Sequence, residues 1–314
     1  MRTVRKPVLG ATLLAVALFA AACGGSGGDD GGNGGDSGGE KPELTVGSDN
    51  FAESQIVAEM YAQMLEAEGY EVSRQLGIES REVRLPAMES GEIDIAPEYV
   101  YTLLSVVLPE SEAASDPALA GDPEALAEEL APELEKQGLE LLEPSDVIDT
   151  NALVVTEETS GELGVEEISD LVQHGPDLTL GGPTECPDRP LCLPGYQEVY
   201  GLEFGDFKSL EYGATITALQ GGEIDVGLLF STDGSIAENG FVLLDDDKNL
   251  QAADNIVPLV RSEIADEEVQ EILNEVSGAI ETDAITELNK RANVDVEDPA
   301  DLATEYLEEL GLLE

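Results

Sequence analysis

The sequence of 314 residues has little of the chemistry on which many enzymes depend. It contains no tryptophan, one histidine (His174), three cysteines and few aromatic residues, and it has no Gly-x-Ser-x-Gly or His-Glu-x-x-His motif. One histidine without a second cysteine pair is also not a metal-binding pattern. We therefore expect a protein that is not an enzyme, with no cofactor and no metal site.

Basic residues are scarce as well. The 14 lysines and arginines face 68 aspartates and glutamates, which gives a net charge of −54 at pH 7. Such a charge repels the phosphate backbone and excludes nucleic acid as a partner. The acidic residues are spread along the chain, so two interpretations stay open: attraction of cationic ligands, or a hydrated surface suited to saline surroundings.

The sequence has one long apolar segment near its N-terminus, Leu14–Ala22, which is too short to span a bilayer and follows several basic residues. This pattern predicts a secretory signal over residues 1–22. Cys23 comes directly after the small residues, as in the signals of bacterial lipoproteins, and this resemblance implies a lipidated cysteine that anchors the protein to the outer face of the cell membrane. The Gly- and Asp-rich stretch over residues 23–42 predicts a flexible linker. An ordinary signal peptide with an incidental cysteine is the alternative.

The two remaining cysteines lie close together in the Pro-rich segment ECPDRPLCLPG. In an exported protein, Cys186 and Cys192 are expected to form a local disulfide. A metal-binding pair is the alternative, although no further cysteine pair is present to complete it.

Short apolar runs alternate with helical patterns along the rest of the chain. We expect an α/β protein with mostly parallel sheets. A capping box of Asn50 and Glu53 is expected to start the first helix, and Asp122-Pro123 to start another. The predicted strands are 44–46, 152–155, 178–180, 224–229, 241–244 and 256–260, and the predicted late helices are 266–280, 283–291 and 298–310.

One segment is repeated. Glu89–Ile95 (ESGEIDI) recurs as Gln220–Val226 (QGGEIDV), and each copy follows an apolar helical segment and precedes aromatic residues. The repeat predicts a helix–turn–strand unit used twice, in two similar lobes that face a shared cleft. Chance similarity of one turn is the alternative.

Four segments resemble the substrate-binding proteins of osmoprotectant ABC importers: VGSDNFAESQIVAEMYAQMLEAEGY (46–70), GEIDIAPEYVYT (91–102), DRPLCLPGYQEVYGLEF (188–204) and FSTDGSI (230–236). The resemblance implies a two-lobe periplasmic-binding-protein clamshell. Each lobe would be a mixed, mostly parallel sheet flanked by helices, and two crossing strands would form the hinge. Residues 43–148 plus 254–314 would form one lobe, and residues 149–253 the other.

The resemblance also implies a function. Such a protein captures a quaternary amine, such as glycine betaine or choline, outside the cytoplasm and delivers it to an ABC permease with ATPase subunits. We expect the part of the protein beyond the lipid anchor to be soluble and monomeric. A binding protein of the same class for another small cationic or polar solute, or an extracellular lipoprotein without a transport role, are the alternatives.

Recognition of such a ligand needs particular side chains. A trimethylammonium group has no N–H to donate, so aromatic faces must hold it, whereas a carboxylate needs a cation or hydrogen-bond donors. The resemblance implies that Tyr99 and Phe230 form part of an aromatic cage. It implies that Thr102 and Arg189 hold the carboxylate.

Other positions depart from the family pattern. Asp49 stands where the family often has lysine, which would remove a carboxylate partner. Asn151 and Ile216 stand where cage tyrosines are found. We also expect Asn50, next to Asp49, at the site, and Tyr101, because its alternation with Tyr99 puts both on one face of a regular strand.

Overall fold

The computed structural model describes residues 41–111, 121–251 and 253–313, which lie within the compact unit Glu40–Glu314. The predicted signal peptide, Cys23 and the linker up to residue 40 lie outside the described residues. In the part of the chain that is described, no helix is long and apolar enough to cross a membrane.

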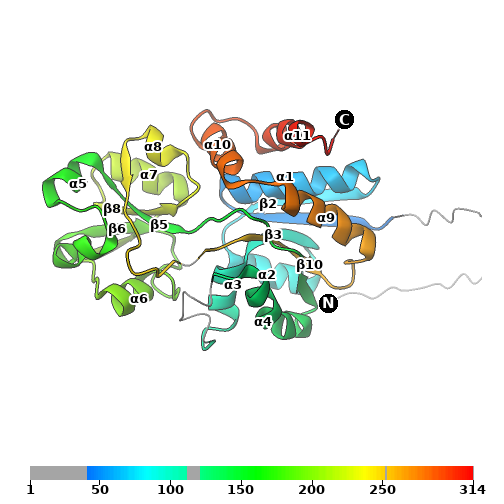
Figure 1. The fold of residues 1–314 in the computed structure, drawn as a ribbon, viewed down its shortest axis with the longest axis horizontal. Helices are drawn as coiled ribbons and strands as arrows, with labels where there is room; N and C mark the ends of the chain where they lie inside the picture. Colours follow the sequence, from blue (N-terminus) through cyan, green and yellow to red (C-terminus); the bar gives the residue numbers. More distant parts are fainter. Residues whose placement is uncertain (1–40, 112–120, 252, 314) are drawn as a thin grey trace, which may run out of the picture. The chain divides into compact units, whose positions relative to one another are not determined.

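The described residues form two mixed five-stranded sheets, each with its own helices (Figure 1). The first sheet, in the order β2-β1-β3-β10-β4, has helices on both faces, and together they are called the first lobe. Its strands are β1 (Glu43–Asp49), β2 (Glu71–Ile78), β3 (Ile95–Tyr99), β4 (Leu139–Leu141) and β10 (Ile256–Arg261). One face is covered by α1 (Ala52–Ala67), α9 (Glu267–Ala279), α10 (Thr282–Asn293) and α11 (Pro299–Leu310), and the other by α2 (Arg81–Ser90), α3 (Val100–Val107) and α4 (Pro123–Lys136).

The second sheet has the order β7-β6-β8-β5-β9 and, with its helices, is called the second lobe. Both sheets are mixed, as predicted, but they are not mostly parallel, because antiparallel pairings are as numerous as parallel ones. Every antiparallel pairing involves β5 or β10, the strands that follow the two crossings between the lobes. The strands of the second sheet are β5 (Asn151–Thr156), β6 (Thr179–Gly182), β7 (Asp206–Ser209), β8 (Val226–Phe230) and β9 (Phe241–Leu243). Its helices are α5 (Glu157–Leu163), α6 (Leu193–Gly195), α7 (Tyr212–Gln220) and α8 (Ser235–Glu238).

The repeated segment forms the same unit in both lobes, which confirms the predicted helix–turn–strand repeat. It connects α2 to β3 in the first lobe and α7 to β8 in the second. The carboxylate of Asp94 accepts the N–H of Thr45 at 2.8 Å, and that of Asp225 accepts the N–H of Thr179, also at 2.8 Å. Each aspartate therefore joins its turn to the neighbouring parallel strand and fixes where the next strand begins.

The chain crosses between the lobes twice, before β5 and before β10. The crossing segments pair with each other: the N–H of Asp149 donates to the carbonyl oxygen of Asp254 at 2.9 Å, and Ile148 forms an antiparallel bridge with Asn255. These are the two crossing strands of the clamshell that the resemblance implied.

Two local predictions were wrong. Phe51, not Asn50, is the N-cap residue of α1, and no side chain caps this helix, because the Glu53 side chain points into the protein instead. Tyr101 is not on the strand with Tyr99: β3 ends at Tyr99, and Tyr101 is in the first turn of α3. The predicted start at Asp122 is confirmed, since its side chain accepts the N–H of Ala125.

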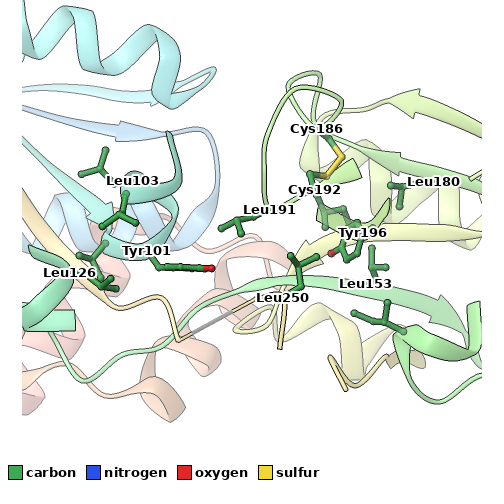
Figure 2. Packing of buried hydrophobic residues seen from close by; sticks show 14 of the residues in the cluster. Tyr101, Leu103, Leu126, Leu153, Leu180, Cys186, Leu191, Cys192, Tyr196 and Leu250 are labelled. Carbon is green, nitrogen blue, oxygen red and sulfur yellow. A yellow bond between two sulfur atoms is a disulfide. The ribbon is translucent and has the colours of Figure 1, made fainter. Parts of the chain in front are cut away.

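A buried apolar cluster extends from α2–α4 through the second lobe. Figure 2 shows Tyr101 beside the side chains of the first lobe, with its ring directed toward the second-lobe residues Leu191 and Leu250. The disulfide of Cys186 and Cys192, whose Cα atoms are 5.2 Å apart, belongs to the same cluster. It closes a short loop and so fixes the position of Leu191 and Arg189 between its ends.

Candidate functional site

Four aromatic side chains meet where the two lobes face each other. Their ring centroids form a row: Tyr99 lies 5.9 Å from Phe51, Phe51 lies 4.7 Å from Phe230, and Phe230 stacks on Tyr212 at 5.8 Å. The first two residues belong to the first lobe and the last two to the second. We call Tyr99, Phe51, Phe230 and Tyr212 the aromatic row.

The repeat explains how the row forms. Tyr99 ends β3 and Phe230 ends β8, so the two rings occupy equivalent positions in the repeated unit. Phe51 immediately precedes α1, and Tyr212 is the first residue of α7. Each lobe thus contributes two rings, one from the end of a strand and one from the start of a helix. They lie at the edge of the sheets where α/β proteins bind ligands.

Two adjoining cavities open beside the aromatic row. The main cavity encloses about 1030 Å³ of empty space, including the part open to solvent, and the smaller inner cavity about 430 Å³. Six residues line both cavities: Asp49, Phe51, Thr102, Asn151, Arg189 and Phe230. All of them except Phe51 are among the predicted site residues. The structure therefore brings these predicted residues together around one space.

The remaining predicted residues lie at different distances from this space. Tyr99 lines the inner cavity, and Asn50 lines the main cavity, where its amide is 3.5 Å from the Glu211 carboxylate. Asn151 donates to the side chain of Gln251 at 3.0 Å. Tyr101 is buried in the apolar cluster and is not among the described residues that line either cavity.

Asp49 is part of a buried ionic network. The fully buried Arg84 donates to both oxygens of Asp49 at 2.8 and 3.1 Å and to Glu98 at 2.8 Å, and Arg81 binds Glu98 at 2.6 Å. Burial alone would raise the pKa of Glu98, but the two guanidinium groups lower it to about 2. The negative charge of Asp49 is thus balanced from behind the cavity, and the network fixes the wall on which Asp49 lies.

Glu53 connects the two lobes beneath the aromatic row. Its carboxylate accepts the hydroxyls of Tyr99 at 2.8 Å and Thr232 at 2.6 Å, and the amide of Asn289 at 2.9 Å. Burial raises the pKa of Glu53, and these hydrogen bonds only partly oppose the effect. Burial and the nearby Glu53 charge also raise the pKa of Asp149 well above its usual value. Since Thr232 is the only one of the three donors from the second lobe, its bond to Glu53 joins the lobes.

The donors expected to hold a ligand carboxylate already bind carboxylates of the protein. The hydroxyl of Thr102 donates to Asp254, which also accepts the N–H groups of Tyr101 at 2.7 Å and Thr102 at 3.0 Å. Arg189 donates to Glu82 at 3.0 and 3.2 Å and contacts Glu185 at 3.4 Å.

Comparison with known proteins identifies the family. Residues 42–309 match the substrate-binding domain of ABC-type glycine betaine transport systems. The chain belongs to this family.

Curated relatives and solved structures agree with this assignment. The chain is 29% identical to a glycine-betaine-binding protein of Pseudomonas aeruginosa, over 86% of this chain and 89% of that protein. It is 28% identical to the carnitine transport binding protein OpuCC of Listeria monocytogenes, over 96% of this chain and 95% of that one. A crystal structure of a glycine betaine/carnitine/choline ABC transporter is similar to this chain, with 26% identity and a TM-score of 0.66, over 86% of this chain and all of the other.

Four residues near the cavities were not predicted as site residues from the sequence: Phe51, Glu53, Tyr212 and Asp254. Tyr212 lies one helical turn before Ile216, where the family resemblance implied a missing cage tyrosine, and residues four apart share a helix face. The aromatic ring is therefore supplied from the preceding turn, while Ile216 packs against the apolar side chains of the second lobe. Phe51 could have been found because it lies in the segment 46–70 that carries the family resemblance.

Proposed function

We propose that the protein captures a quaternary ammonium solute between its lobes and delivers it to an ABC permease. The observation that carries this proposal is the aromatic row, with two rings from each lobe, beside a cavity bordered by carboxylates. Aromatic faces attract a cation within about 6 Å of the ring centroid, and no N–H donor of the ligand is needed. Relatives described as binding glycine betaine and carnitine support the same ligand class.

Movement of the lobes would couple binding to transport. We propose that the lobes, 43–148 plus 254–314 and 149–253, turn about the two crossing segments and close when a ligand joins both halves of the aromatic row. Ligand contacts made only in the closed form would favour that form, and a permease with ATPase subunits would recognise it. The protein acts as a binding protein and not as an enzyme, since the family comprises transport components.

The N-terminal segment completes the proposal. A lipid on Cys23 would hold the protein outside the cell membrane, and residues 24–42 would act as a linker between the anchor and the binding domain. Anchoring keeps the local concentration near the permease high.

The aromatic row provides the test. Replacing Phe230 or Tyr212 by leucine keeps the apolar volume and removes the aromatic face, so choline and tetramethylammonium should bind about 5- to 30-fold more weakly. Isothermal titration calorimetry of the purified protein measures the change. Phe207→Leu, in β7 of the second lobe and outside both cavities, is the matched control and should leave the affinity unchanged. Equal affinities in all three variants would refute cation binding at the row.

A further inference from the structure

The groups that would bind a ligand carboxylate are already engaged within the protein. Thr102 and two backbone N–H groups at the start of α3 bind the carboxylate of Asp254, which is only 4% exposed. Arg189 binds Glu82 and Glu185. A ligand carboxylate would have to displace Asp254 from Thr102 and the α3 N–H groups, and at Arg189 it would compete with Glu82 and Glu185 for the guanidinium.

Charge around the cavities disfavours an anionic group in the same way. Arg189 and Arg81 are the cationic side chains among the described lining residues, and Arg81 is bound to Glu98 through both Nε and Nη2. Acidic side chains are more numerous along the walls: Asp49, Glu79, Asp149, Glu185, Glu211 and Asp254. Both arginines are already paired with glutamates of the protein, and a ligand carboxylate in this space would also be repelled by Glu79 and Glu211.

The main cavity also extends past the aromatic row along an apolar wall. Val106 of α3 contributes to this wall from the first lobe. The other residues come from the second lobe: Pro183, Cys186, Leu191, Cys192, Leu210, Leu228 and Leu229. We call these residues the apolar wall. The disulfide fixes the part around Leu191, and β8 supplies Leu228 and Leu229 next to Phe230.

The lining of the main cavity agrees with a ligand longer than a betaine, because the apolar wall continues beyond the aromatic residues Phe51, Tyr212 and Phe230 that border the same cavity. A trimethylammonium group at the aromatic row would leave the apolar wall uncovered. Only a substituent on the cation can reach it.

We propose that the ligand is a quaternary ammonium cation with a net positive charge, no carboxylate, and an apolar substituent that lies against the apolar wall. Alkyltrimethylammonium ions and acyl esters of choline have this chemistry. The inference rests on the proposed function, because the cationic head is placed at the aromatic row.

A ligand series measured by calorimetry tests both parts of the proposal. Choline should bind at least ten-fold more tightly than glycine betaine, which has a similar size and differs in its carboxylate. Affinity should then rise from tetramethylammonium through butyl- to hexyltrimethylammonium, by up to about four-fold for each methylene buried. Glycine betaine binding as tightly as choline, or affinity independent of chain length, would overturn the inference while leaving the proposed function intact. If no member binds, tetramethylammonium included, both proposals fail.

Variants locate the two contacts. Leu228→Thr should reduce the gain in affinity per methylene and leave tetramethylammonium binding unchanged, whereas Leu243→Thr in β9, outside the main cavity, should alter neither.

Glu82→Gln removes the negative charge that pairs with Arg189, so the affinity for glycine betaine relative to choline should rise by about five-fold, the effect of one exposed charge pair. Glu89→Gln, exposed on the same helix, makes the same change of net charge and is the control. Equal shifts in the two glutamine variants would show that Arg189 is not involved.

Discussion

Asp254 illustrates at the scale of one residue how the protein fills its own binding site. It lies in the second crossing segment, yet its carboxylate binds the N-terminus of α3, far away in sequence. Burial raises its pKa from the usual 3.8 to about 7, although Thr102, the nearby Arg81 and the two N–H groups oppose the shift. The folded protein therefore holds this proton over a pH range in which the unfolded chain has lost it.

This residue should make stability depend on pH. Between about pH 4 and 7 the folded state binds more protons at Asp254 than the unfolded state does, so the free energy of unfolding should fall as the pH rises through this range. The full difference of about three pH units corresponds to at most roughly 4 kcal/mol. Asp254→Asn cannot ionise, so its stability should change less between pH 4 and 7 than that of the wild type. Chemical unfolding at several pH values measures both slopes, and equal slopes would show that Asp254 does not titrate there.

The site could be predicted from sequence only where local signals exist. Tyr99 and Phe230 follow the repeated turn, and Asp49, Thr102, Asn151 and Arg189, all expected at the site, line the cavities. What those side chains bind could not be predicted, because Arg84, Glu82 and Asp254 reach them through tertiary folding. No pattern near Thr102 indicates that a residue about 150 positions later occupies its hydroxyl.

At the scale of secondary structure, several buried strands and the late helices were predicted well, whereas the more exposed strands β2 and β7 were not predicted. Short apolar runs placed β5, β9 and β10 to within one or two residues, because buried strands leave a direct signal in composition. The start of α3 was missed because its first N–H groups are capped by Asp254 and no local residue marks the helix start. Where the cap is local, as at Asp122, the prediction was confirmed.

The repeated turn makes a matched pair of stability predictions. Asp225→Ala leaves the N–H of Thr179 without its acceptor and should lower the free energy of unfolding by about 1–3 kcal/mol. Asp94→Ala should cost more, because Asp94 also binds Arg261 at 2.7 Å. Urea unfolding measures both, and Asp295→Ala, an exposed aspartate, controls for the lost charge. If Asp225→Ala behaves like this control, the turn does not depend on its carboxylate.

At the scale of the whole molecule, the two lobes are in contact through both apolar and polar groups. One apolar cluster includes residues of both lobes, and Phe51 lies against Phe230. Among the polar contacts, Thr232 binds Glu53, Asn289 contacts both, and Arg189 binds Glu82 across the cleft. Opening of the lobes would have to separate these apolar contacts as well as exchange the hydrogen bonds. The buried ionic network of Arg84 lies within the first lobe, so opening need not break it.

The net charge of −54 should make the stability of the molecule depend on salt. With 14 basic residues against 68 acidic ones, most carboxylates have no cation to pair with, so repulsion between them opposes the compact state. Raising NaCl from 0.05 to 1 M shortens the screening length to about 3 Å and should raise Tm by at least about 2–4 °C, the equivalent of roughly 1 kcal/mol. Differential scanning calorimetry measures this, and sucrose at equal osmolality controls for effects other than screening. If Tm stayed constant or fell instead, the weakening of ion pairs by salt would outweigh the screened repulsion. Repulsion between the acidic residues would then not lower the stability of the folded state.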